Sequence, residues 1–531
     1  MNHQTHTNDV QLELVQRTIE RLLQFARKAQ LIDRTDEVLM RNTWIDLLQI
    51  EEPYSGNVLD ETLDSPVELL EILLNHAAAT GILIENTTTN RDLLDARIMG
   101  TLTPKSSEVI SRFWKIATQN SIQAATDYFY RLCIDVNYIR MNRIQKNELW
   151  LSATEYGDLE ITINLSKPEK DPKEIALLQS LPQRTYPRCL LCIENVGYSG
   201  RLDHPARQNL RVIPLKLDGD DWYFQYSPYV YYPEHCIIFS GEHVPMRITK
   251  QTFERILDVI DQIPHYFVGS NADLPVVGGS ILNHDHFQGG HHRFPMEMSV
   301  AERSFTHTEY TQVRASIIKW PMSVIRLTSH NRIALTQLAD RILDMWRAYS
   351  DSEVGIFAHT SSPSGLAIPH NTITPIGRNN RRGEYELDLV LRNSRTSEEH
   401  PEGIFHPHAH LHHIKRENIG LIEVMGLAVL PGRLQQELAE IAGFLTGVTS
   451  IERNNPRGQP QHHLYKHLVW IEELLSNYGT RLSEQQAREA MRVEVGNKFL
   501  EVLHHAGVYA RNSQGQEAFG RFMSHVGFTE I

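Results

Sequence analysis

Two histidines and a glutamine stand at alternate positions between two pairs of glycines. The segment reads Gly278-Gly279-Ser280-Ile281-Leu282-Asn283-His284-Asp285-His286-Phe287-Gln288-Gly289-Gly290. Side chains alternate along a strand, so an extended chain over 282–288 would place His284, His286 and Gln288 on one face. The glycines leave space for a ligand near the backbone, and their N–H groups could meet phosphate oxygens.

This pattern makes His286 a candidate nucleophile. A neutral imidazole can attack phosphorus without a separate base if its other nitrogen carries the proton and is held by a carbonyl. Gln288 can donate a hydrogen bond to a phosphoryl oxygen but cannot supply a proton or activate water, which favours transfer over hydrolysis. A His-x-His pair is also typical of a metal site or an ordinary polar edge, and the motif alone leaves both alternatives open.

The His-x-His-x-Gln pattern resembles the signature of galactose-1-phosphate uridylyltransferases, the transferase branch of the histidine triad superfamily. The whole glycine-flanked segment is similar to the second, mainly Gram-positive bacterial type. Other stretches resemble that type in the expected order: YIRMNRIQKNELW at 138–150, INLSKPEKDPK at 163–173, PHYFVGSNADLPVVGG at 264–279, PHNTITPI at 369–376 and HHIKRENIGLIEVMGLAVLP at 412–431. The resemblance therefore covers most of the chain.

The resemblance implies a ping-pong reaction. UDP-glucose would uridylylate His286 and release glucose 1-phosphate, and galactose 1-phosphate would then take the UMP. Gln288 would contact the phosphoryl group, and Asn271, Gly279 and Ser280 are the further candidate substrate-binding residues. The expected partners are these nucleotide sugars and hexose 1-phosphates, without an organic cofactor, and a homodimer is the family expectation.

A first metal site is implied by the CxxC pair in PRCLLCIENVGYSGR. This stretch resembles the CxLCxxNVxxxG stretch of the first type of the family, whose cysteines bind zinc with two histidines. The matching set here is Cys189, Cys192, His243 and His284, and two thiolates with two imidazoles would form a closed structural site. Two buried thiols without metal are the alternative.

A second metal site is implied by the run His406-Pro407-His408-Ala409-His410-Leu411-His412-His413. If this run were a strand, alternate imidazoles would share a face. The resemblance places His370, His408 and His410 in a site for iron or zinc, with Glu297 or Glu302 as the acid. Because the chain is generally rich in histidine, ordinary polar roles are the alternative.

Two rival functions belong to different classes. One is a dinucleoside polyphosphate phosphorylase or hydrolase on the same fold, and the other is a non-catalytic protein that binds a nucleotide sugar. Gln288 disfavours hydrolysis, and the extent of the resemblance disfavours the phosphorylase. The presence of His286 together with Gln288 disfavours the binding protein.

The elements that would position these residues follow from periodicity. Apolar residues at three- and four-residue spacing predict a helical N-terminal region over 1–135. Alternating segments at 159–165 and 230–240 predict strands in a catalytic histidine-triad-like domain over 136–325. A strand at 385–393 and a helix capped at Ser483 predict a second such domain with a helical tail over 326–531. The predicted class is α+β, with duplicated histidine-triad-like sheet domains and helical N-terminal and C-terminal additions.

The composition restricts the partners and the location. A net charge of −13 over 531 residues is the wrong sign for a protein that binds nucleic acid through its phosphates. No apolar run is long enough for a membrane span, and the first residues do not resemble a secretion signal. Four cysteines are too few for a disulfide framework in a chain of this size. We therefore expect a cytoplasmic enzyme.

Overall fold

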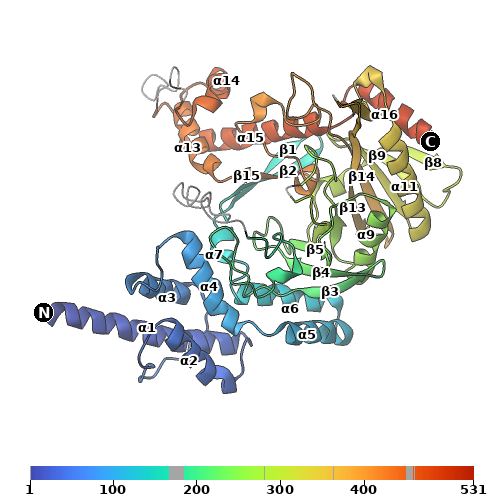
Figure 1. Ribbon diagram of the computed structural model, residues 1–531. Helices are drawn as coiled ribbons and strands as arrows, with labels where there is room; N and C mark the ends of the chain where they lie inside the picture. The colour runs from blue at the N-terminus through green and yellow to red at the C-terminus, as the bar shows by residue number, and fades with distance from the viewer. Residues whose placement is uncertain (1, 167–183, 280, 363, 450–458, 460) are drawn as a thin grey trace.

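The computed structural model describes the chain except residues 1, 167–183, 280, 363, 450–458 and 460 (Figure 1). Ser280 therefore lies outside the described residues, and so do residues 167–173 of the segment at 163–173. Among the helices that the structure describes, none combines the length and the apolar character needed to cross a bilayer.

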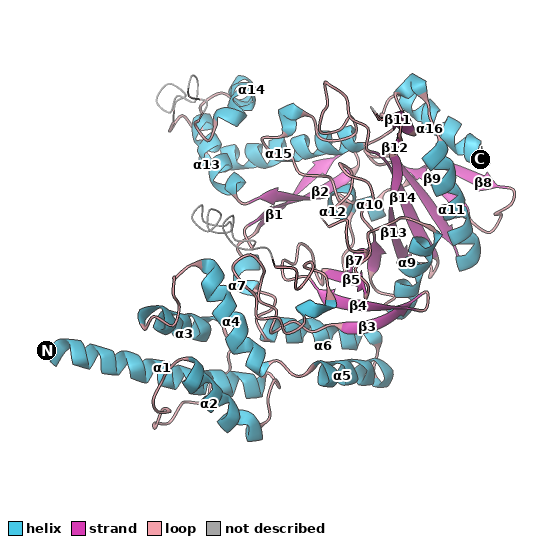
Figure 2. Cartoon of the chain, in the orientation of Figure 1, coloured by secondary structure: helices cyan, strands magenta, loops and turns pink. Residues whose placement is uncertain are grey.

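The N-terminal region is helical, as the apolar spacing predicts (Figures 1 and 2). Its helices are α1 (Asn2–Lys28), α2 (Glu37–Leu47), α3 (Val67–Ala79), α4 (Thr88–Leu102), α5 (Ser106–Gln119) and α6 (Ile122–Asp135). Their buried residues, such as Val15 and Leu22, belong to the same core as the main sheet. Helix α6 makes that contact directly, since the rings of Phe129 and Phe224 lie 5.6 Å apart between centroids.

One large sheet of eleven strands forms the body of the protein. Its strands are β3 (Ile213–Leu217), β4 (Asp220–Tyr226), β5 (Cys236–Ser240), β6 (Phe267–Gly269), β7 (His286–Gly290), β8 (Ala301–His307), β9 (Arg314–Ile318), β10 (Val324–Ser329), β13 (Asn371–Asn379), β14 (Tyr385–Asn393) and β16 (Phe528–Glu530). They lie in the order β16-β8-β9-β10-β14-β13-β6-β7-β5-β4-β3.

The strand order contains the same unit twice. In the first unit, strands β3, β4 and β5, helix α9 (Lys250–Gln262) and strands β6 and β7 follow one another, and β7 pairs with β5. In the second unit, strands β8, β9 and β10, helix α11 (Arg332–Ala348) and strands β13 and β14 follow, and β14 pairs with β10. The units meet where β6 pairs with β13. This repeat confirms the predicted duplicated α+β fold.

The first unit ends with β7, and the second unit begins with β8. This point lies before the predicted boundary at 325/326, because β8 and β9 pair in series with β10. The hairpin of β11 (His359–Ser361) and β12 (Ala367–Pro369) is an insertion between α11 and β13. Since both units share one continuous sheet, the predicted division into three domains stays a prediction.

The two faces of the sheet belong to different cores, as the alternation along β14 shows. Leu387, Leu389 and Leu391 point into the core shared with α9 and α11, whereas Val390 belongs to a second core. That second core is completed by β1 (Glu148–Thr154), β2 (Gly157–Asn164), β15 (Leu427–Pro431), α13 (Arg433–Leu445), α14 (Leu468–Tyr478) and α15 (Glu484–Ala506). In the described part of the chain, the remaining α-helices are α7 (Met141–Ile144), α10 (Pro295–Met298), α12 (Leu421–Val424) and α16 (Ser513–Val526).

Local predictions were right where one pattern ran without interruption. The strand predicted at 385–393 is β14, and Ser483 caps α15 through a hydrogen bond from the backbone N–H of Gln486. The strand predicted at 230–240 begins only at Cys236. Pro233 offers no N–H to a ladder, and Glu234 is left-handed with φ of 54°.

Candidate active site

Strand β7 begins at His286, between β5 and β6. The Nδ1 atom of His286 lies 2.8 Å from the carbonyl oxygen of His284, to which it can donate. Burial lowers the pKa of His286 to about 4, so the ring is neutral and carries one proton. With that proton on Nδ1, Nε2 keeps its lone pair, and no group among the described residues bonds to it. This is the geometry that a nucleophilic imidazole requires.

Gln288 lies beside His286 on the same face of the sheet, because side chains two residues apart on a strand share a face. Its Oε1 lies 3.1 Å from Nε2 of His235. His235 immediately precedes the neighbouring strand β5 and is 2% exposed. The amide oxygen of Gln288 is therefore engaged, whereas its NH2 group can face a ligand.

His284 does not share the face of His286, contrary to the prediction. The chain bends at residues 283 and 284, and the strand begins only at His286. The ring of His284 turns toward the cysteines, and its Nε2 lies 2.9 Å from the carbonyl oxygen of Ser240. His284 therefore belongs to both sites, since its carbonyl contacts the ring of His286 while its own ring contacts the cysteine pair.

The four residues of the first predicted metal site are brought together. Cys189 Sγ lies 3.2 Å from His284 Nδ1 and 3.5 Å from Cys192 Sγ. Cys192 Sγ lies 3.1 Å from His243 Nδ1. A tetrahedral zinc ion with bonds of about 2.0–2.3 Å would separate such ligands by about 3.5–3.8 Å, close to these separations. The bond to Ser240 puts the proton of His284 on Nε2 and leaves Nδ1 free to bind a metal.

Two of the three predicted substrate-binding residues are described, and they pack against each other. Asn271 Oδ1 accepts a hydrogen bond of 2.8 Å from the backbone N–H of Leu421, so its amide is oriented. A Cβ atom on Gly279 would lie 2.6 Å from Asn271 Nδ2. Glycine at position 279 is therefore what allows the loop to approach this amide.

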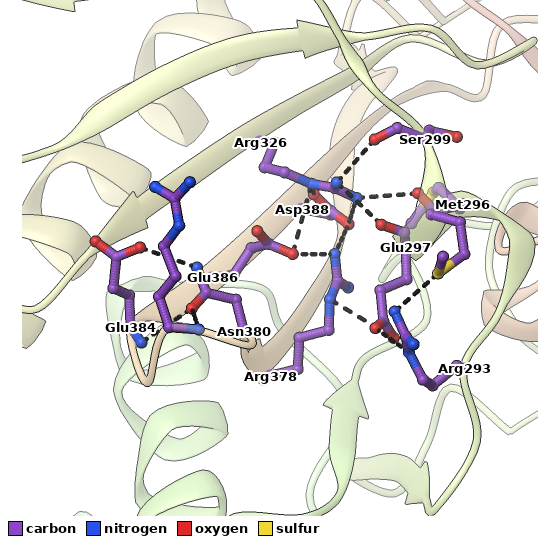
Figure 3. Close-up of polar contacts among 12 residues, drawn as sticks. Arg293, Met296, Glu297, Ser299, Arg326, Arg378, Asn380, Glu384, Glu386 and Asp388 are labelled. Atoms are coloured by element: carbon purple, nitrogen blue, oxygen red, sulfur yellow. Dashed lines mark hydrogen bonds and ion pairs between the residues drawn. The ribbon is translucent and has the colours of Figure 1, made fainter.

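The second predicted metal set is not brought together. His370 contacts Thr360 at 2.7 Å, His408 stacks on His505, and His410 pairs with Glu501 at 2.7 Å. The candidate acids are also occupied. Glu297 pairs with Arg293 at 2.8 Å and lies near Arg378 (Figure 3). Glu302 pairs with Arg511.

The physical reason is that the histidine run is not a strand. Residues 409–411 form a 3-10 helix, with a hydrogen bond of 2.9 Å from Leu411 N to His408 O. The imidazoles therefore diverge. Two other groupings of three possible ligands occur here among the residues that the structure describes: Glu402 with His406 and His412, and His410 with Glu501 and His505.

A cavity of about 320 Å³ adjoins the cysteine pair, since Leu190 of the CxxC sequence lies in its wall. Arg140, Arg143, Arg201 and Arg207 also line it, together with Asp92 and Asp203, which form ion pairs with three of these arginines. Sequence reasoning missed this cavity because its walls come from the helical region, the CxxC segment and residues 201–209. It also missed His235, which no motif marks.

The duplicated α+β sheet presents a carbonyl-held histidine beside a glutamine, an arrangement typical of a protein that transfers a group through a covalent intermediate on histidine. The model of the galactose-1-phosphate uridyl transferase N-terminal domain matches residues 34–245. The model of the C-terminal domain of the same family matches residues 259–450. Together they cover most of the chain, and the chain belongs to the galactose-1-phosphate uridylyltransferase family.

Relatives of nearly the same length agree with this assignment. A galactose-1-phosphate uridylyltransferase of Caldanaerobacter subterraneus is 58% identical, over 97% of this chain and 98% of its own length. The corresponding proteins of Fusobacterium nucleatum and Bacillus subtilis are 51% and 48% identical, over 96% of this chain and 98% and 97% of their own lengths. Among solved structures, yeast Ap4A phosphorylase aligns over 63% of this chain and 90% of its own, at 12% identity and a TM-score of 0.29.

Proposed function

We propose that this enzyme transfers UMP from UDP-glucose to galactose 1-phosphate through a uridylyl group on His286. The observation that supports this most directly is the state of His286: neutral, with Nδ1 bonded to the His284 carbonyl and Nε2 available. The relatives named above, nearly as long as this chain, carry the name of this activity.

In the first half-reaction, Nε2 of His286 attacks the uridine-bearing phosphorus of UDP-glucose. The bond from that phosphorus to the bridging oxygen breaks, and glucose 1-phosphate leaves with the electron pair. A phosphate oxygen of galactose 1-phosphate then attacks the same phosphorus and displaces His286 as a neutral imidazole. The NH2 group of Gln288 would donate to a nonbridging oxygen on which charge builds up during both steps.

Asn271 and Gly279 are proposed as further substrate contacts, because the amide of Asn271 is already oriented by Leu421. Ser280, outside the described residues, remains proposed from the resemblance alone.

We propose zinc for Cys189, Cys192, His243 and His284. Two thiolates and two imidazoles fill a tetrahedral shell, so the ion would have a structural role and no open position for substrate. With its ring held at this site, His284 would also present its carbonyl oxygen at a fixed position, where it accepts the Nδ1 proton of His286.

A cytoplasmic location and a homodimer complete the proposal. None of the four cysteines forms a disulfide, which is usual for proteins of a reducing compartment. The homodimer rests on the family resemblance. The net charge of −13 supports a protein that acts without nucleic acid.

The test is to incubate the protein with UDP-glucose labelled in the uridine and to look for label on the chain. A phosphoramidate on His286 should survive base and be lost in acid, and galactose 1-phosphate should discharge it as UDP-galactose. His286→Ala is the matched control and should stay unlabelled. If folded wild-type protein takes up no label, the donor or the nucleophile is wrong, and a binding protein becomes the better description.

A further inference from the structure

The amide of Gln288 is held from one side by a segment that the proposed reaction does not use. This segment, residues 231–235, runs up to the start of β5. His235 Nε2 contacts Gln288 Oε1 at 3.1 Å, and the Tyr232 hydroxyl donates to the carbonyl oxygen of Gly289 at 3.1 Å. Two neighbouring residues of β7 are thus bonded to the same segment.

The environment of His235 determines which of its nitrogens carries the proton. Burial lowers the pKa of His235 to about 4, so the ring is neutral and has a single N–H. Its Nδ1 is buried without a hydrogen-bond partner, whereas Nε2 faces the Gln288 side chain. A proton on Nδ1 would leave a buried donor unsatisfied and would turn the Gln288 oxygen toward the ligand. The proton therefore belongs on Nε2, where it is donated to Oε1.

The ring of His235 is held in place by its surroundings. It packs against Tyr232, with centroids 4.5 Å apart, and against Tyr231, at 5.4 Å. Glu234 adopts a left-handed backbone conformation that is unfavourable for a non-glycine residue. Its carboxylate accepts a hydrogen bond from the Tyr266 hydroxyl, which helps to fix this turn.

We propose that His235 is a positioning residue that orients the Gln288 amide for the transfer reaction. By donating to Oε1, it prevents a 180° rotation that would present the amide oxygen, instead of the NH2 group, to a negatively charged phosphoryl oxygen. This inference rests on the proposed function, since it assigns a role in the same reaction.

The first variant is His235→Phe, which keeps a ring for the tyrosine contacts and removes the donor. Single-turnover uridylylation of the protein by labelled UDP-glucose is the measurement. Loss of a whole oxyanion donor costs roughly 10²–10³ in rate. Because a free amide still visits the productive orientation, we expect a smaller loss, on the order of 10-fold, with the KM for UDP-glucose little changed. His235→Gln, whose NH2 group can donate at the same place, should recover most of the rate.

The decisive comparison uses Gln288→Ala. If His235 acts through the Gln288 amide, His235→Phe should slow wild type but should not slow the Gln288→Ala protein further. A general structural role would instead slow both backgrounds by the same factor, and that result would overturn the inference, as would a wild-type rate for His235→Phe. If wild-type protein takes up no label at all, the proposed function fails first. Circular dichroism of each variant checks that it is folded.

Discussion

Asp388 lies at the centre of a buried ion network on the second sheet unit (Figure 3). It is completely buried and accepts hydrogen bonds from Arg326 Nε at 2.7 Å, Arg326 Nη2 at 2.9 Å and Arg378 Nη2 at 2.6 Å. Burial by itself would raise the pKa of Asp388, but the two guanidinium groups hold it below its ordinary value. The folded protein therefore contains this group as an anion.

Replacing Asp388 by asparagine should destabilise the protein strongly. The amide would turn one accepting oxygen into an NH2 group that faces a guanidinium donor, and it would remove the negative charge between two buried cations. Arg378 keeps Glu386 at 2.5 Å, and Arg326 keeps three backbone carbonyls, so part of the network survives. Breaking a buried pair on one side typically costs about 3–5 kcal/mol of unfolding free energy, and we expect Asp388→Asn to fall in this range.

The measurement is equilibrium unfolding in urea, followed by fluorescence and circular dichroism. Asp221→Asn is the matched control, since Asp221 and Lys216 form a pair at 2.7 Å on β4 and β3 that is 69% and 67% exposed. The same chemical change there should cost at most about 1 kcal/mol. Equal, small effects of the two substitutions would refute the reasoning, because they would mean that the buried carboxylate is not needed to compensate the guanidinium groups.

Three further outcomes are expected. Gly279→Ala forces a methyl group against Asn271 and should raise the KM for UDP-glucose, on the order of 10-fold, in steady-state assays. Cys192→Ala should lower the zinc content of the purified protein, measured by elemental analysis, and slow uridylylation because His284 loses its anchor. Burial lowers the pKa of His467 to about 4, against about 6.5 in an unfolded chain. The neutral His467 ring therefore contributes fully to stability above pH 6.5, and this contribution is lost as the pH falls toward 4. The loss amounts to about 2 kcal/mol by pH 5. In urea titrations, the free energy of unfolding should therefore fall less between pH 7 and pH 5 for His467→Gln than for wild type.

The sequence predicted the parts of the fold where a single periodicity decides the structure. Strand β14 alternates Leu387, Leu389 and Leu391 with residues of the opposite face, and the alternating pattern predicted its bounds correctly. The helical N-terminal region and the cap at Ser483 followed from spacing and from side-chain hydrogen bonding. The gathering of the CxxC pair with His243 and His284 followed from the family resemblance, since these residues lie far apart in the chain.

The sequence could not show where the chain leaves regular structure. The bend before His286 turns the ring of His284 away from the strand face, although an alternating pattern predicts that it stays there. The left-handed Glu234 directs His235 toward Gln288, and the residue types around Glu234 do not predict that turn. In the histidine run, hydrogen bonds of a 3-10 helix replaced the expected strand. In each place a few backbone angles decided which side chains meet.

The duplicated sheet also predicts how many uridylyl groups one chain can carry. Gln288, Gly269, Ile376 and Asp388 pair in series across β7, β6, β13 and β14, so Gln288 and Asp388 face the same side of the sheet.

On β14, the strand equivalent to β7, that side continues with Glu386, Val390 and Arg392, and it has no imidazole. The two acidic side chains there bind Arg378 and Arg326, which makes this face of the second unit a structural network. Uridylylation should therefore saturate at one UMP per chain, measured by intact mass. Two groups per chain would mean that a histidine outside β7 also acts as a nucleophile.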